Sequence, residues 1–301
     1  MVQIYTAADG SYALQAAVLF KSLAETQASD VVLTILGNNW SRSQRMLLEA
    51  STSANCKFEV IEVPDALGAK VNLTRNFPLP VVYNLLGPLK FFQDQTRILY
   101  MDADTMVRND LQRLYRREMG SAVAACIDAH SSFVASPSMW RPWREESVPP
   151  LAPALNTGVM LIDVGRWNKA RITERSLELL SRYTMPCIDQ DALNIVLQGE
   201  FDRLEPRYNQ MPYHYLPMWR YADVFEKSDA INEALDDPAI VHFHRSFLGK
   251  PWNVGCYHPR MKEWRSLARR IKRGWFPKLS LMEFARGQAA RVSGMARISN
   301  P

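Results

Sequence analysis

The stretch Arg97-Ile98-Leu99-Tyr100-Met101-Asp102-Ala103-Asp104-Thr105-Met106-Val107 places two carboxylates directly after a continuous apolar run. An unbroken run of this kind is typical of a strand that is buried on both faces, usually in a parallel sheet. Because side chains alternate along a strand, we expect Asp102 and Asp104 on the same side of the pleat. Both would lie at the carboxyl end of the strand, which is the edge of an open α/β sheet where ligands bind.

This pair of carboxylates suits a divalent cation. Hard oxygen ligands without Cys or His in the motif favour Mg²⁺ or Mn²⁺, held together with a substrate phosphate, and a cation would relieve the repulsion between the two charges. Two alternatives stay open. Asp at the end of a strand can also cap the following turn or helix. A phosphatase motif, Asp-x-Asp-x-Thr, follows a buried strand as well, although Thr105 stands one position too early for it.

Strand and helix patterns alternate on both sides of this segment, which predicts a doubly wound α/β sheet. Residues 136–153 are rich in Pro, Trp and charge, so we expect a long functional loop there, with Trp140 and Trp143 as candidates for covering the acceptor or for anchoring the loop. Another loop is expected at 65–80. Strands are expected at 2–7, 31–36, 58–63, 97–102, 122–127, 157–162 and 240–244, and helices near 14–23, 41–51, 83–92, 171–184 and 189–198.

Length and cysteine usage limit the class of protein. The 301 residues are enough for one large α/β domain or two small ones, and a hydrophobic content of 47% is ordinary for globular proteins. The four cysteines are scattered without a Cys-x-x-Cys pair, so we expect neither a zinc site nor a disulfide framework, and a reducing cytosol fits. A strand pattern begins at once, which leaves no room for a signal peptide, and no apolar run reaches the ~20 residues that span a membrane.

Charge is concentrated at the C-terminal end. From residue 260 onward eleven Lys and Arg stand against two Glu, a balance of +9, whereas the whole chain carries +5. The composition shifts only here, so we expect a catalytic domain at 1–257 and a basic tail at 258–301. An anionic partner is expected for the tail, and nucleic acid is not, because no reader motif is present.

The tail predicts a basic amphipathic helix. Such a helix, with Trp at its boundary, either lies on an anionic membrane surface or packs its apolar side against the domain, and the pattern leaves both open. Most of the Lys and Arg residues fall on other faces of this helix. The apolar residues that recur at helical spacing are Met261, Trp264, Ala268, Ile271 and Trp275.

Further polar residues stand at the ends of predicted elements. Asp9 closes the first strand, where a carboxylate accepts hydrogen bonds from a base or ribose or simply forms an Asp-Gly turn. Asp128 follows the strand expected at 122–127, and Asn156 directly precedes the strand expected at 157–162. Asp189-Gln190-Asp191 opens a helix, where acidic residues are common as caps.

Two histidines complete the candidate metal site. In Val241-His242-Phe243-His244 a strand period places both imidazoles on one face, which suits metal ligation. Gly249-Lys250 follows, and Lys is a good point-charge partner for phosphate, although a turn with a surface Lys is the simpler alternative.

Taken in order, these pieces resemble glycosyltransferase family 8, which holds glycogenin, galactinol synthase and bacterial lipooligosaccharide α-galactosyltransferases. Each stretch is weak alone, but their order and spacing are specific, and the bacterial lipooligosaccharide enzymes are the most similar. The matching stretches are Ala7-Ala8-Asp9, 99–104, Asn156-Thr157-Gly158-Val159-Met160-Leu161-Ile162, Asp189-Gln190-Asp191-Ala192-Leu193-Asn194, 207–212, Val241-His242-Phe243 and Lys250-Pro251-Trp252.

The resemblance implies a GT-A fold, in which a single Rossmann-like mixed sheet is flanked by helices, here followed by a basic C-terminal helical tail. It implies an enzyme that moves a hexose, galactose or glucose, from a UDP-sugar to a saccharide with retention of configuration, with Mn²⁺ or Mg²⁺ on the diphosphate. The acceptor would be a glycolipid of the lipopolysaccharide core type. The enzyme would then be cytoplasmic and peripheral on the inner face of the cytoplasmic membrane.

The same resemblance assigns residues by position. Asp102, Asp104 and His242 would hold the metal; His244 keeps the family's spacing to Lys250, but we prefer His242 because its flanking residues match. The transferred sugar would meet the catalytic residues Asp128, Asn156, Asp189 and Gln190. The donor nucleotide would contact Ala7, Asp9, Tyr12, Ala103, Gly158, Gly249 and Lys250.

Two questions of mechanism stay open. Gln190 matches the residue beside the anomeric carbon, and an amide is a poor nucleophile, so we favour a front-side displacement over a covalent route through Asp189. The family also has an Arg or Lys on the diphosphate where this chain has Leu85 and Leu86, and Lys90 is the candidate replacement. This departure keeps a nucleotide-sugar binding module with little activity as an alternative.

Overall fold

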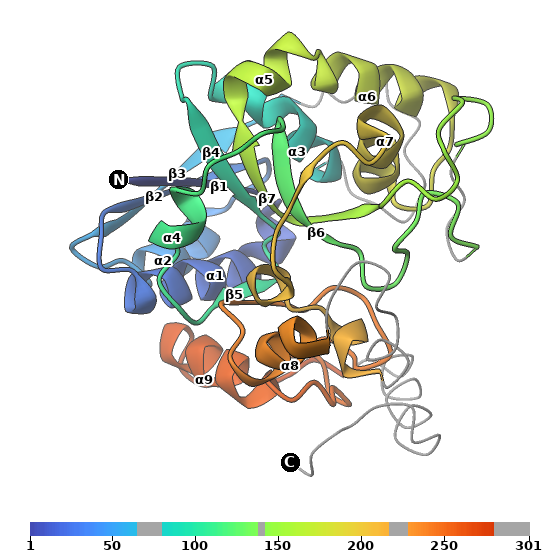
Figure 1. The fold of residues 1–301 in the computed structure, drawn as a ribbon. Coiled ribbons are helices and arrows are strands. Elements are labelled where there is room, and N and C mark those ends of the chain that lie inside the picture. Colours follow the sequence, from blue (N-terminus) through green and yellow to red (C-terminus); the bar gives the residue numbers. More distant parts are fainter. Residues whose placement is uncertain (65–79, 138–141, 217–227, 280–301) are drawn as a thin grey trace.

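The protein is described by a computed structural model that covers residues 1–64, 80–137, 142–216 and 228–279. Its centre is a seven-stranded mixed sheet with the strand order β3-β2-β1-β4-β7-β6-β8 (Figure 1). Nearly all of the predicted loop at 65–80, and Trp140, lie outside the described residues. The strands of this sheet are β1 Val2–Ala7, β2 Val31–Gly37, β3 Cys56–Glu62, β4 Arg97–Met101, β6 Val123–Ile127, β7 Leu155–Asp163 and β8 Asp202–Arg203.

Two directions of pairing make the sheet mixed. Strands β1, β2, β3 and β4 run parallel to one another, whereas β7 is antiparallel to both β4 and β6. The amino end of β7 therefore meets the carboxyl ends of β1 and β4 at one edge of the sheet. The apolar run that precedes Asp102 is the central strand β4, and its residues 98–101 are all buried, as predicted for a strand covered on both faces.

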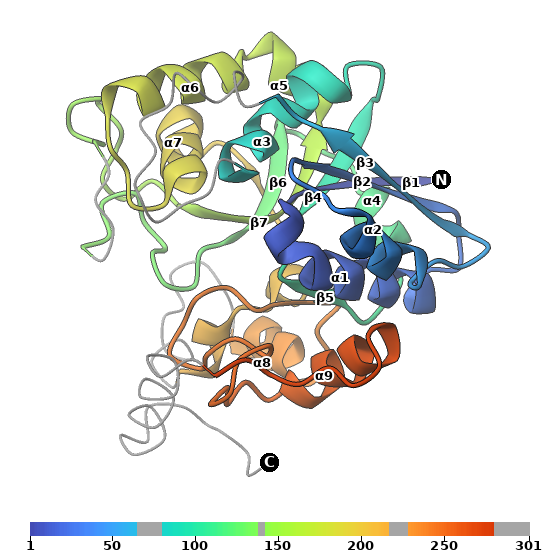
Figure 2. The same cartoon turned by 180° about the vertical axis from the view of Figure 1, so that it is seen from behind.

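Helices cover both faces of the sheet (Figures 1 and 2). Side chains of α1, α2 and α9 pack against one face of the sheet and form the main hydrophobic core with it. Side chains of α3, α5, α6 and α7 pack against the opposite face and form a second core. The helices are α1 Ala13–Thr26, α2 Arg42–Glu49, α3 Pro80–Leu86, α4 Gln112–Tyr115, α5 Val164–Lys169, α6 Ile172–Arg182, α7 Ile188–Leu197, α8 Ser228–Asp236 and α9 Met261–Ile271.

A small two-stranded sheet and several short turns surround one end of the main sheet. Strand β5 (Thr105–Val107) pairs antiparallel with β9 (Ile240–His242). The expected strand 240–244 thus ends at His242. Short 3₁₀ turns lie at η1 Gly10–Tyr12, η4 Pro206–Asn209 and η5 Pro212–Tyr215.

The helix expected at 83–92 has two parts. Helix α3 ends at Leu86 and continues as a π-helical turn over Gly87–Phe91. Pro88 explains the change, because proline has no amide hydrogen and its ring disturbs the preceding helical turn. The described parts of the expected loop 136–153 contain neither helix nor strand, and half-buried Trp143 packs against the second core.

The predicted tail helix is part of the main core. Trp264 is 0% exposed, and its ring lies 5.4 Å from Trp252 and 5.5 Å from Trp275. Arg270 also makes two hydrogen bonds of 2.8 Å to Glu25 in α1. The boundary predicted at 257/258 therefore does not coincide with a break in packing, and the apolar face predicted for α9 is buried in protein. Among the described helices, none combines the length and apolar content that crossing a bilayer requires.

Candidate functional site

Asp102 and Asp104 lie in a tight turn and not in the strand itself. Strand β4 ends at Met101, and Thr105 donates from its amide and its hydroxyl to the Asp102 carbonyl over 3.1 and 2.8 Å. The Asp102 amide donates to the Gly158 carbonyl in β7 over 2.8 Å. The two carboxylates are therefore held side by side by turn geometry, and the strand periodicity that predicted this arrangement is not its cause.

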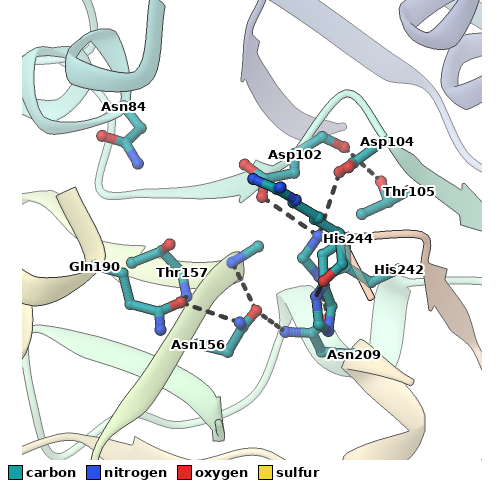
Figure 3. Close-up of polar contacts among 12 residues, drawn as sticks. Asn84, Asp102, Asp104, Thr105, Asn156, Thr157, Gln190, Asn209, His242 and His244 are labelled. Carbon is teal, nitrogen blue, oxygen red and sulfur yellow. Dashed lines mark hydrogen bonds and ion pairs between the residues drawn. The ribbon is translucent and has the colours of Figure 1, made fainter. Parts of the chain in front are cut away.

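His242 reaches this turn because β9 pairs with β5. Thr105 stands opposite His242, and the Phe243 amide donates to the Asp104 carbonyl over 2.9 Å. His242 Nε2 consequently lies 3.4 Å from Asp102 Oδ2 and 3.2 Å from Asp104 Oδ1 (Figure 3). One potential ligand atom from each of the three residues lies within 4.8 Å of the others.

A glycine makes room for the imidazole. A Cβ at Gly158 would lie only 2.1 Å from His242 Cε1 and 2.4 Å from its Nδ1. Any other residue at this position would displace the ring. Gly158, expected among the residues that contact the donor, thus lies directly against His242.

His244 is oriented differently. Its ring stacks on Tyr213 at a centroid distance of 5.7 Å, and its Nδ1 lies 3.1 Å from the Arg245 carbonyl, to which it donates when protonated there. The ring lies 4.9 Å from that of His242, centre to centre. The geometry therefore favours His242 over His244 beside the two carboxylates, in line with the preference drawn from the flanking residues.

The three side chains fit a Mn²⁺ or Mg²⁺ ion. His242 Nδ1 lies 3.0 Å from Asn209 Oδ1, which leaves Nε2 directed at the two carboxylates and not at a hydrogen-bond donor. Two carboxylates and one imidazole are a common donor set for such ions. Burial alone would lower the pKa of His242, but the negative charges of Asp104 and Asp102 raise it to about 9.

Lys250 adds a second positive charge. Its Nζ lies 2.5 Å from Asp104 Oδ2 and 5.1 Å from the centre of the Trp252 ring. Burial would raise the pKa of Asp104, but Lys250 and His242 outweigh it and hold that pKa below its usual range. Gly249, with φ of +72°, supplies the left-handed turn before the lysine.

The residues expected to meet the nucleotide line the same edge. Asp9 Oδ1 accepts from the Ser11 amide over 2.8 Å and from its hydroxyl over 2.5 Å, so Asp9 caps the turn η1. Tyr12 closes that turn, and its ring meets Trp252 edge-on at 6.2 Å. Ala7 is the last residue of β1, and Ala103 is buried between the two aspartates.

Three of the four residues expected at the sugar form one buried network. Asp128 Oδ2 accepts from Asn156 Nδ2 over 2.9 Å and from Gln190 Nε2 over 3.1 Å, and Asn156 Nδ2 also donates to Gln190 Oε1 over 3.0 Å. Burial would raise the pKa of Asp128, but these and backbone hydrogen bonds lower it, so the carboxylate is ionised. Three predicted residues from β7, α7 and the loop after β6 are thus brought together.

Asp189 lies apart from this network. It accepts from Asn84 Nδ2 over 2.6 Å, and burial together with the charge of Asp102 raises its pKa to about 7. Asp191 accepts from the Cys187 amide over 2.9 Å and is completely buried, which gives it the capping role considered for it.

Several site residues were not predicted. Asn84 in α3 holds Asp189, the Tyr100 hydroxyl donates to Asp102 Oδ1 over 2.6 Å, and Asn209 contacts His242. Asn84 is a polar residue inside an otherwise apolar segment, and Asn209 lies in the stretch 207–212 that carries the family resemblance, so these were the available signals. Leu85 and Leu86 are buried, and Lys90 is exposed on the π-turn.

The chain belongs to glycosyl transferase family 8, whose sequence model matches residues 3–256. General stress protein A of Bacillus subtilis is 26% identical over 274 residues, which are 88% of this chain and 92% of that protein. A lipopolysaccharide 1,2-glucosyltransferase of Escherichia coli K12 is 26% identical over 56% of this chain and 48% of its own length.

The fold has solved counterparts. Galactosyltransferase LgtC, solved with donor and acceptor sugar analogs, matches with a TM-score of 0.73 at 22% sequence identity, over 90% of this chain and 96% of that one. The mixed sheet is therefore a GT-A fold. The family and the fold class predicted from the sequence are both confirmed.

Proposed function

We propose that this protein transfers a hexose, galactose or glucose, from a UDP-sugar to a saccharide acceptor with retention of configuration. The observation that carries the proposal is the approach of Asp102, Asp104 and His242 to within 4.8 Å of one another, at the ligand-binding edge of a GT-A sheet. Lys250 stands beside this group, and Asp128 joins Asn156 and Gln190 in one network. Figure 3 shows Asn156 and Gln190 near the Asp102–Asp104 turn.

The departing UDP gains negative charge, and the site is built to neutralise it. Asp102, Asp104 and His242 would hold Mn²⁺ or Mg²⁺, which supplies Lewis-acid stabilisation of the diphosphate when bound. Lys250 would add a fixed positive charge at the diphosphate. Asp9, Tyr12 and the backbone at Ala103 and Gly249 would contact the rest of the nucleotide.

A front-side displacement agrees best with the sugar side of the site. Gln190 uses both ends of its amide in hydrogen bonds with Asp128, Asn156 and the Thr157 amide, so it orients and does not attack. The acceptor oxygen forms the new bond to the anomeric carbon as the bond to the diphosphate breaks, and the leaving diphosphate takes the acceptor proton. Asp189, with a pKa raised to about 7, is partly neutral at neutral pH and is a weaker candidate for a nucleophile.

The acceptor would be a glycolipid of the lipopolysaccharide core type at the cytoplasmic face of the membrane. Relatives named as lipopolysaccharide glucosyltransferase and galactosyltransferase support this choice. The end of the described chain supports membrane contact, because Phe276 is 76% and Leu279 72% exposed beside exposed Lys272, Arg273 and Lys278. Exposed apolar and basic side chains together favour an anionic bilayer surface.

Thermal unfolding with UDP, with and without Mn²⁺, tests the donor proposal. UDP should raise the midpoint only when Mn²⁺ is present, and no shift with both would contradict the proposal. A panel of UDP-sugars, followed by hydrolysis over hours, then identifies the hexose.

A binding module without activity is the second candidate, because Leu85 and Leu86 are buried where the family has a cation. Stabilisation by UDP and Mn²⁺ without turnover of any UDP-sugar would favour it. Release of phosphate from phosphosugars would instead favour a phosphatase.

A further inference from the structure

Asn209 joins the candidate metal site to the candidate sugar site. Its side chain is 0% exposed and makes two hydrogen bonds. Oδ1 lies 3.0 Å from His242 Nδ1, and Nδ2 donates to Asn156 Oδ1 over 2.8 Å. Figure 3 shows Asn209 between these two side chains. A buried amide with both ends engaged is well placed to fix the orientation of its neighbours.

Two groups of fixed polarity decide how Asn156 is oriented. The Gly158 amide can only donate, and it donates to Asn156 Oδ1 over 3.0 Å. Asp128 is an ionised carboxylate that can only accept, and its Oδ2 lies 2.9 Å from Asn156 Nδ2. The oxygen of Asn156 therefore faces Gly158 and Asn209, and its NH₂ group faces Asp128.

The orientation of Asn156 determines the orientation of Asn209, which in turn determines which ring nitrogen of His242 carries the hydrogen. Because Asn156 presents an oxygen, Asn209 must present its NH₂ group to Asn156 and its oxygen to His242. His242 Nδ1 must then carry the hydrogen. In the neutral ring, Nε2 consequently presents its lone pair toward Asp102 and Asp104, which is the tautomer that ligates a metal through Nε2.

We propose that Asn209 is a positioning residue that transmits the polarity set by Gly158 and Asp128 to His242 and holds His242 Nε2 ready for the cation. This inference rests on the metal-dependent function proposed above. It gives the stretch 207–212 a role beyond the resemblance it carries. It also predicts that metal affinity depends on a side chain that does not touch the metal.

Two substitutions and one control test the role. Asn209→Leu has similar volume but removes both hydrogen bonds. Asn209→Asp keeps an acceptor for His242 Nδ1–H and, as the neutral acid, also a donor for Asn156 Oδ1. Ser22→Ala is the matched control, because Ser22 is 2% exposed and also makes two hydrogen bonds, to the Leu19 carbonyl over 2.7 Å and from the Val107 amide over 2.9 Å. The affinity for Mn²⁺ in the presence of UDP is measured on the full chain from the free-Mn²⁺ EPR signal.

Asn209→Leu should weaken Mn²⁺ binding by roughly 10–100-fold, the usual effect of losing the partner of a metal-bound histidine. Asn209→Asp and Ser22→Ala should bind Mn²⁺ within about threefold of the wild type. Wild-type affinity in Asn209→Leu would overturn the proposal, as would an equal loss in Asn209→Asp.

The control for folding is circular dichroism of each variant. If Asn209→Leu does not fold, Asn209→Asp alone decides, because retained Mn²⁺ binding supports the role and lost binding contradicts it. If the wild type binds no Mn²⁺ with UDP, the proposed function fails first and this inference fails with it.

Discussion

Four side chains balance their charges at the carboxyl end of β4. Asp102 and Asp104 are negative, and Lys250 and protonated His242 are positive. Each carboxylate has an oxygen within 3.4 Å of a nitrogen of Lys250 or His242. Such a cluster tolerates burial because every charge has an opposite neighbour. A divalent cation would replace the proton on His242, so the residues proposed to bind it are also those that hold the cluster together.

Replacing one carboxylate should abolish the metal-dependent step. We expect Asp102→Asn to lower the affinity for UDP in Mn²⁺ by about 100-fold or more, because an amide is a poor substitute for a charged oxygen ligand. Isothermal titration with UDP measures this effect. His242→Ala should behave in the same way and His244→Ala should not; the reverse result would transfer the ligand role to His244.

Gln190 should act at the chemical step. Its side chain faces Asp128 and Asn156 and makes no hydrogen bond to the Asp102–Asp104 turn in the described structure. We expect Gln190→Ala to lower kcat roughly 100-fold while changing UDP affinity much less. Steady-state kinetics beside UDP titration separate the two effects, and an equal loss in both would remove Gln190 from the sugar side of the site.

At the scale of elements, the close contact between Gly158 in β7 and the His242 imidazole on β9 constrains the site. We expect Gly158→Ala to displace His242, because the added Cβ would lie 2.1 Å from the ring, and overpacking of this kind typically costs about 1–3 kcal/mol. Mn²⁺ affinity and the urea midpoint should both fall. Gly165→Ala in α5 is the control, since its Cβ would meet only the Asp163 side chain at 3.5 Å.

The strands and helices were largely predictable because their signals are local. The apolar run before Asp102 and the alternation of strand and helix patterns predicted β4, α2 and the sheet, and Ser41 with Gln44 forms a capping box at the start of α2. The π-turn after α3 and the pairing of β5 with β9 depend on contacts between distant segments, which a pattern of neighbours does not contain. The same reason hid Asn84 and Asn209, whose partners stand 105 and 33 residues away.

The whole molecule depends on α9 for stability. We expect Trp264→Ala to lower the free energy of unfolding by about 3–5 kcal/mol, because a completely buried indole packed between two other Trp rings would leave a cavity. Urea denaturation followed by tryptophan fluorescence measures this loss. A change below about 1 kcal/mol would mean that α9 is an appendage, as the predicted boundary at 257/258 had it.

Stability should also depend on pH through a buried histidine. Burial lowers the pKa of His214 from 6.5 to about 4, although the charge of Asp128 acts in the opposite direction. The unfolded chain therefore binds more protons between these two values, so stability is complete above about pH 6.5 and falls as the pH drops toward 4. The contribution is on the order of 3 kcal/mol. His214→Asn, which keeps an acceptor for the Met211 amide, should flatten the difference in urea midpoint between pH 7 and pH 5; an unchanged difference would contradict the assignment.

Membrane attachment needs a test that spares the core. Because α9 is buried against α1, a chain truncated near residue 258 would lose part of its core, and its failure to bind vesicles would mean little. Exposed Phe276 and Leu279 and the nearby basic residues can be changed without touching that core.

Each Lys or Arg near an anionic leaflet contributes on the order of 1 kcal/mol to membrane binding, screened by salt. The wild type should therefore sediment with anionic vesicles at low salt and be released at high salt, whereas the variant with Lys272→Glu, Arg273→Glu and Phe276→Ser should stay in the supernatant and still hydrolyse UDP-sugar. Equal sedimentation of both proteins would exclude this surface as the anchor and remove its support for a lipid-linked acceptor.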